Sequence, residues 1–108
     1  MTYEVYVTPL AWQEIENSYE WLAQLSRAAA VRWKEKTEAA IMGLALDPHR
    51  HPEAPEAFKA GFDLRQMLVG RRHATFRVLF EIADTAVRFL RVRHNKQELL
   101  EADELQYS

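Results

Sequence analysis

The sequence predicts a single α+β domain with the element order β-α-α-β-β-β, in which an antiparallel sheet carries a helical hairpin packed on one face. Apolar residues recur every three or four positions between residues 9 and 46, and every second position between residues 63 and 94. These are the periods of helices and of strands. A chain of 108 residues has the usual length of one domain. We therefore expect one domain over residues 1–108, of which residues 95–108 form a short C-terminal tail.

The first strand is predicted at residues 3–8, because the segment YEVYVT alternates and is rich in aromatic and β-branched residues. Thr8 and Pro9 then provide an N-cap and a proline at the first helical position. The helix that follows places its apolar side chains on one stripe. The members of this stripe are Ala11, Ile15, Tyr19, Leu22 and Leu25.

A second helix begins after Ser26, which is a suitable N-cap, and ends before Pro48, which lacks a backbone donor. Two amphipathic helices with a very short connection form an antiparallel hairpin. We expect Trp12, Trp21 and Trp33 to pack within it. The apolar stripe of the second helix consists of Ala30, Trp33, Thr37, Ala40, Ile41 and Leu44.

Residues 48–62 contain three of the four prolines and are predicted to form a loop. This loop carries His49, His51 and Glu53, which invites the hypothesis of a metal site. Three potential ligands on an irregular segment, with no cysteine in the chain, do not make a tetrahedral site. We therefore expect neither a metal nor another cofactor.

Three strands are predicted at residues 63–69, 74–82 and 86–94, joined by turns at "GRRH" and "ADT". Alternation divides each strand between two faces of the sheet. One face of the middle strand is wholly apolar and belongs beneath the helices; it carries Phe76, Val78, Phe80 and Ile82. The other face is predicted to be open to solvent.

This open face is the predicted binding surface, because it mixes arginines with apolar side chains. In the last strand, strict alternation places Arg91 and Arg93 on this face together with Phe89, and Arg88 on the face opposite to them. The candidate residues for binding are Arg65, Arg77, Leu79, Phe89, Arg91 and Arg93.

Charge is distributed unevenly along the chain. Residues 63–96 contain eight Lys or Arg against three acids, a charge of +5, which leaves −7 for the rest of a chain whose total is −2. A basic region of this kind favours an acidic or polyanionic partner. The alternative is that the arginines only protect strand edges from aggregation.

Two absences indicate a cytoplasmic protein with no membrane partner. The chain has no cysteine, which is compatible with a reducing compartment. The sequence has no signal-peptide pattern and no uncharged apolar run long enough to span a bilayer.

The order of the segments resembles that of the RelE/ParE superfamily, the toxins of bacterial type II toxin-antitoxin pairs. The resemblance covers residues 3–96 and rests on a strand, a helical hairpin ending in "LALDP", and the later segments "LRQMLVG", "FRVLFEI" and "FLRVRH". It implies the same β-α-α-β-β-β fold. It also implies a toxin that a cognate antitoxin neutralises.

A resemblance to RelE-like members implies a ribosome-dependent mRNA endonuclease, in which cations stabilise the charge that develops on the phosphate. The positions that match this pattern are Arg65, Arg77 and Lys96. His94 is the candidate for proton transfer, because histidine changes its charge near neutral pH. The alternative for His94 is a packing role at the end of its strand.

The closer resemblance is to the ParE-like branch, notably in "RVLFEI" and in the strand that ends "VRH". In addition, Asp63 takes a position where the nuclease pattern has a lysine. The ParE-like branch implies inhibition of DNA gyrase through protein binding, without a hydrolytic site. A third hypothesis is an inactive or orphan binding domain of the same fold.

Overall fold

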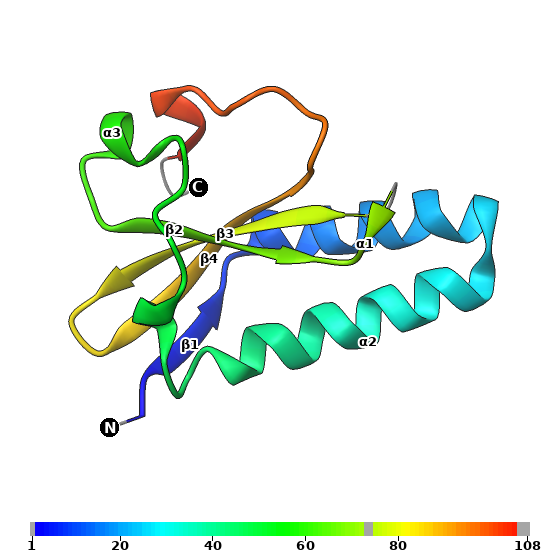
Figure 1. Cartoon of the computed structure of the whole chain (residues 1–108), viewed down its shortest axis with the longest axis horizontal. Coiled ribbons are helices and arrows are strands. Elements are labelled where there is room, and N and C mark those ends of the chain that lie inside the picture. Colours follow the sequence, from blue (N-terminus) through cyan, green and yellow to red (C-terminus); the bar gives the residue numbers. More distant parts are fainter. Residues whose placement is uncertain (1, 73–74, 106–108) are drawn as a thin grey trace.

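The computed structural model describes residues 2–72 and 75–105 and contains a four-stranded sheet with a pair of long helices on one face (Figure 1). The predicted β-α-α-β-β-β order is confirmed. Residue 74, the predicted start of the middle strand, lies outside the described residues, as does His73. The main elements are β1 (Glu4–Val7), α1 (Pro9–Leu25), α2 (Arg27–Gly43), β2 (Leu64–Val69), β3 (Phe76–Ala83) and β4 (Ala86–His94).

The sheet is mixed, which corrects the prediction of a wholly antiparallel sheet. Its strand order is β1-β4-β3-β2, and β2, β3 and β4 form an antiparallel meander as predicted. β1, however, pairs with β4 in parallel, with Glu4 opposite Ala86 and Val7 opposite Phe89. Short turns force antiparallel pairing, but β1 and β4 are separated by most of the chain and are free to run in the same direction.

The helical hairpin has the predicted form, because a single residue both ends α1 and begins α2. The backbone N–H of Ser26 donates to the carbonyl of Leu22, at 2.8 Å, while its side chain accepts from the N–H of Ala29, at 3.2 Å. At the start of α1, Thr8 caps the N–H of Ala11 in the same way, at 3.2 Å. Both predicted N-caps are confirmed.

The main core lies between the hairpin and the sheet and includes the predicted residues Ile15, Leu22, Trp33 and Ile41. Three predictions about the hairpin are wrong. Leu25 is 72% exposed, since the tip of the hairpin extends beyond the strands (Figure 1). Trp12 and Trp21 are nearly half exposed, because they lie beside the apolar stripe of α1 rather than on it.

A β-bulge interrupts the pairing of β3 with β4. Leu79 lies opposite Arg91, whereas the next residue, Phe80, lies opposite Phe89. Leu90 is therefore an extra residue in β4, and such an insertion reverses the alternation of faces beyond it. After Leu90, the odd-numbered side chains of β4 therefore point to the face that the even-numbered side chains occupy before it.

The bulge overturns the predicted faces of β4. Phe89, which alternation predicts on the open face, lies opposite Phe80 and joins the main core, with 5.5 Å between the ring centroids. Arg88 lies opposite Glu81, on the same face as Arg91, although alternation predicts opposite faces. Because nothing in the local sequence marks the extra residue, a regular period of two cannot reveal it.

The sheet face away from α1 and α2, called here the second face, is covered rather than open. The segment at residues 52–54 runs along the outer edge of β2, where the N–H of Gln66 donates to the carbonyl of Pro52, at 3.1 Å. The chain then continues above the second face, and the C-terminal segment, residues 95–105, lies beside it (Figure 1). Three short helices belong to residues 48–62 and 95–105: η1 (Pro48–Arg50), α3 (Ala57–Ala60) and η3 (Ala102–Leu105).

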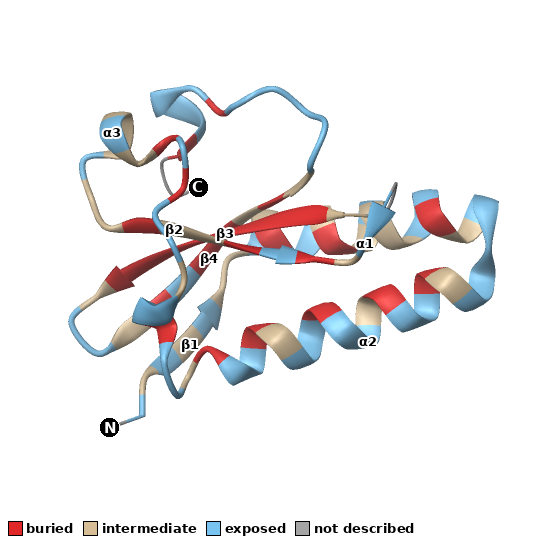
Figure 2. Ribbon diagram, in the orientation of Figure 1, coloured by how far each residue is buried: buried red, intermediate tan, exposed pale blue. Residues whose placement is uncertain are grey.

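A second, smaller core fills the space between the second face and this cover, so that buried residues occur on both sides of the sheet (Figure 2). Leu100 and Leu105 of the C-terminal segment are 0% and 1% exposed. Residues 95–105 of the segment predicted as a tail are thus part of the folded domain, while residues 106–108 lie outside the described residues. The second core consists of Ala54, Leu64, Leu79, Leu90, Leu100 and Leu105.

Candidate functional site

The predicted open face does not exist as a surface, because its central side chains are buried. Leu79 and Phe89 are fully buried, and Arg77 is 4% exposed. Leu79 lies on the predicted face but beneath the C-terminal segment, while Phe89 lies on the other side of the sheet. The physical cause is apolar burial, since the leucines of the C-terminal segment complete a core with those of the sheet.

Arg77 fastens the C-terminal segment to the sheet through Glu56. Its Nη2 donates to Oε1 of Glu56 at 2.5 Å, and its Nε donates to Gln66 at 2.9 Å. The other oxygen of Glu56 accepts the backbone N–H of Leu100 at 3.0 Å. Burial alone would raise the pKa of Glu56, but the hydrogen bonds from Arg77 and Leu100 hold the pKa below its usual value.

Arg65 lies on the opposite face of the sheet from Arg77. It stands opposite Phe80, which faces the helices, whereas Arg77 stands opposite Leu68. The side chain of Arg65 forms an ion pair with Asp63 at 2.9 Å. It also donates to the carbonyls of residues 49 and 51, at 3.0 and 2.9 Å. Arg65 therefore holds the loop of residues 48–62 in place.

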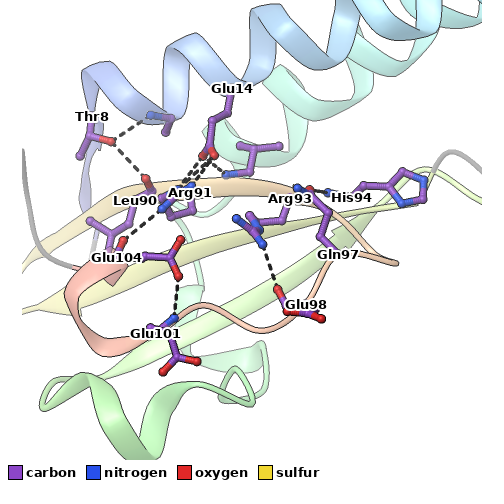
Figure 3. A network of polar contacts seen from close by, with 12 residues as sticks. Thr8, Glu14, Leu90, Arg91, Arg93, His94, Gln97, Glu98, Glu101 and Glu104 are labelled. Atoms are coloured by element: carbon purple, nitrogen blue, oxygen red, sulfur yellow. Dashed lines mark hydrogen bonds and ion pairs between the residues drawn. The ribbon is translucent and has the colours of Figure 1, made fainter.

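Arg91 connects β4 to α1 and to the C-terminal segment (Figure 3). It makes a bidentate ion pair with Glu14 of α1, with contacts of 2.8–3.1 Å, and donates to the carbonyl of Glu104 at 3.2 Å. Glu14 also accepts the backbone N–H of Val92 at 2.8 Å. Glu14 therefore provides a hydrogen-bond acceptor for a backbone N–H of β4 that lies beyond the residues paired with β1.

Arg93 and His94 also make internal contacts at the end of β4 (Figure 3). Nη2 of Arg93 donates to the carbonyl of Glu98 at 2.9 Å. Nδ1 of His94 accepts the backbone N–H of Lys96 at 3.1 Å. The His94 ring packs edge-on against Phe76, with 5.1 Å between centroids. These contacts correspond to the packing role for His94.

The structure does not bring the predicted nuclease residues together. Arg65 and His94 stand on the helix side of the sheet, Arg77 stands on the second face, and Lys96 lies in the turn after β4. Arg77 and Arg93 do lie directly opposite each other on the second face. The cover of residues 48–62 and 95–105 buries Arg77 and leaves Arg93 half-buried.

A pocket between α1 and the end of the sheet is a feature that sequence reasoning missed. This end pocket has a volume of about 280 Å³. Its α1 wall follows the spacing i, i+3, i+4, i+7, which marks one side of a helix and was the available signal. Its lining residues are Glu14, Asn17, Ser18, Trp21, Phe76, Val92, His94 and Gln97.

Exposed basic residues stand beside the end pocket. The turn between β2 and β3 contains Arg71 and Arg72, and Lys96 follows His94. The backbone N–H of Asn95 donates to the carbonyl of Thr75 at 2.9 Å, so the two turns are neighbours. The pocket therefore combines an aromatic floor with a positively charged border.

Two other kinds of site were searched for in the described part of the chain. Within residues 2–72 and 75–105, no group of three or more His, Asp or Glu side chains is placed to hold a metal ion. Over the same residues, no helix has the length and apolar character that crossing a bilayer requires.

The fold is shared with a protein described as the chromosomal ParDE TA system from P. aeruginosa, with a TM-score of 0.67. The two are 13% identical over 86% of this chain and 96% of that chain, and at this identity the likeness shows the fold alone. No curated protein matches the chain significantly. Among protein families, the match is to the ParE toxin of type II toxin-antitoxin system, parDE, over residues 5–99. This chain therefore belongs to the ParE family of toxins from type II toxin-antitoxin systems.

Proposed function

We propose that this ParE-family toxin acts by binding DNA gyrase, without hydrolytic chemistry of its own, and that a cognate antitoxin neutralises it. The observation that carries the proposal is the use of its arginines as internal fasteners. Arg65 holds the loop before β2, while Arg77, Arg91 and Arg93 hold the C-terminal segment.

Cleavage of RNA would need several cations around one phosphate, together with a general base and a general acid. Arg65 and Arg77 stand on opposite faces of the sheet, so one phosphate group does not meet both. Asp63, at a position where the nuclease pattern has a lysine, is the ion-pair partner of Arg65. This arrangement supports an inhibitor that works by binding.

Releasing Arg77 for a substrate would be costly. The Glu56 carboxylate is fully buried, and its pairing with Arg77 compensates the charge of both groups. Breaking a buried ion pair by removing one partner typically costs about 3–5 kcal/mol. A nucleic acid that recruited Arg77 would have to repay this cost and also displace the C-terminal segment.

The proposal predicts that the purified chain inhibits supercoiling of a relaxed plasmid by gyrase and leaves ribosome-bound mRNA intact. Both assays should be run on the same preparation, with and without the cognate antitoxin. The antitoxin should restore supercoiling. Codon-specific cuts in the mRNA would overturn the proposal in favour of a nuclease, and inactivity in both assays would favour an orphan binding domain.

A further inference from the structure

We infer that the end pocket receives an apolar side chain from an acidic segment of the cognate antitoxin. This inference rests on the proposed function only in taking the partner to be an antitoxin. It starts from Trp21, a large aromatic residue in the second half of α1 that is 46% exposed. An exposed aromatic side chain beside a pocket is a frequent anchor of protein interfaces.

The pocket has a preformed aromatic floor. The Trp21 ring meets His94 edge-on, with 5.6 Å between centroids, and meets Phe76 at 6.5 Å. Phe76 is itself 3% exposed and packs against Trp33 of the main core. The floor is therefore fixed by the fold, and binding a side chain there would require little rearrangement of the protein.

The one acidic side chain in the wall, Glu14, is already paired. Both oxygens of Glu14 accept hydrogen bonds, from Arg91 and from the N–H of Val92. Asn17, Ser18 and Gln97 line the remaining wall with neutral hydrogen-bonding groups. An apolar side chain thus meets apolar atoms inside the pocket, and the backbone beside it meets neutral polar groups.

The border supplies the charge that selects the partner. Arg71, Arg72 and Lys96 are exposed, and no acidic residue occurs at positions 70–75 or 95–97 of the sequence. Like charges close together produce a field that attracts an acidic segment and speeds its association. The partner segment therefore carries Asp or Glu next to the apolar side chain that enters the pocket.

A peptide fits these features better than a nucleic acid. A base stacked on Trp21 would bring a phosphate with it, yet none of the residues that line the pocket is Lys or Arg. A peptide needs positive charge only at the border, where the basic turns are.

The first test fills the pocket by the substitution Ser18→Trp. Its matched control is Ala39→Trp, which adds the same side chain at an exposed position of α2, away from the pocket. Affinity for the cognate antitoxin should be measured by titration calorimetry. We expect Ser18→Trp to weaken binding at least tenfold and Ala39→Trp to change it less than twofold. Equal affinities for the two variants would overturn the inference.

The second test removes the anchor and reverses the border charge. Trp21→Ala should weaken binding without filling the pocket, so the inference stays testable if Ser18→Trp folds poorly. Arg71→Glu should slow association several-fold more than Arg32→Glu, a reversal at an exposed position of α2. The difference should shrink as salt rises. Equal slowing by both reversals would overturn the claim that the partner segment is acidic.

A third arm separates the classes of partner and separates this inference from the proposed function. A 12-nucleotide single-stranded DNA should bind the wild-type chain no better than it binds Ser18→Trp. If the pocket variants lose the oligonucleotide and keep the antitoxin, the occupant is a nucleic acid and the inference fails. Gyrase inhibition is measured on the free wild-type chain, so its failure would be seen independently of antitoxin binding.

Discussion

Glu56 is the residue on which the attachment of the C-terminal segment depends most directly. One of its oxygens pairs with Arg77 of β3, and the other accepts the N–H of Leu100. A glutamine here would keep the shape of the side chain but would lose the charge and one of the two acceptor oxygens. The sequence did not single out Glu56, because one glutamate in a proline-rich loop carries no local signal of its partners.

We expect Glu56→Gln to lower the free energy of unfolding by about 3–5 kcal/mol, because it leaves the charge of Arg77 buried and unpaired. The control is Glu53→Gln, an exposed position in the same loop, which should change stability by less than about 0.5 kcal/mol. Urea denaturation of the two variants measures the difference. Similar midpoints would show that the pair contributes little.

The same carboxylate makes stability depend on pH. The pKa of Glu56 in the folded chain is lower than its ordinary value of 4.5. A carboxylate of this kind contributes stability that is complete above the unfolded pKa and is lost as the pH falls through the folded pKa. The free energy of unfolding should therefore fall more steeply in the wild type than in Glu56→Gln as the pH drops from the unfolded pKa of Glu56 to its lower folded pKa. Parallel curves for the two proteins would contradict the assignment.

At the scale of elements, the sequence predicted the helical hairpin well and the faces of β4 poorly. Ser26 and the three-to-four spacing determine the hairpin through local contacts, which sequence patterns record directly. The bulge at Leu90 depends on how β4 fits against β3 and the second core, which is a tertiary effect. This one residue moved Phe89 and Arg88 to faces that alternation does not predict.

The C-terminal segment contributes to the second core through only one of two neighbouring leucines. Leu100 is fully buried against the second face, while Leu99 is 47% exposed. Leu100→Ala should lower the free energy of unfolding by about 2–5 kcal/mol, the usual range for a buried leucine. Leu99→Ala should change it by less than half as much. Thermal melts of both variants test this, and equal losses would mean that the segment does not pack as described.

At the scale of the whole molecule, the chain has a three-layer arrangement in which regular helices cover one face of the sheet and irregular segments cover the other (Figure 1). The element order could be read from local periods and their succession, and the family from the resemblance of the segments to known toxins. The accessible site could not, because a surface depends on which segments return to cover it. The end pocket lies between α1 and the end of the sheet where β3 begins and β4 ends.

The two covering layers should differ in local stability. Several backbone N–H groups of the C-terminal segment donate to side chains, as Leu100 does to Glu56 and Glu101 does to Glu104, rather than to a helix or sheet ladder. Segments held in this way open with less free energy than core elements. Hydrogen exchange should therefore be faster at the amides of Leu100 and Glu101 than in the middle of β3 or α2.

Glu56→Gln should accelerate exchange at these two amides by a larger factor than exchange in α2, because it removes the charge that holds the segment to Arg77. The experiment uses native-state exchange read by NMR, with Glu53→Gln as the control that changes charge equally at an exposed position. Uniform acceleration in all elements would mean that the chain opens only as one unit. Selective acceleration would mean that the arginines of the second face become accessible by local opening, without loss of the hairpin or its end pocket.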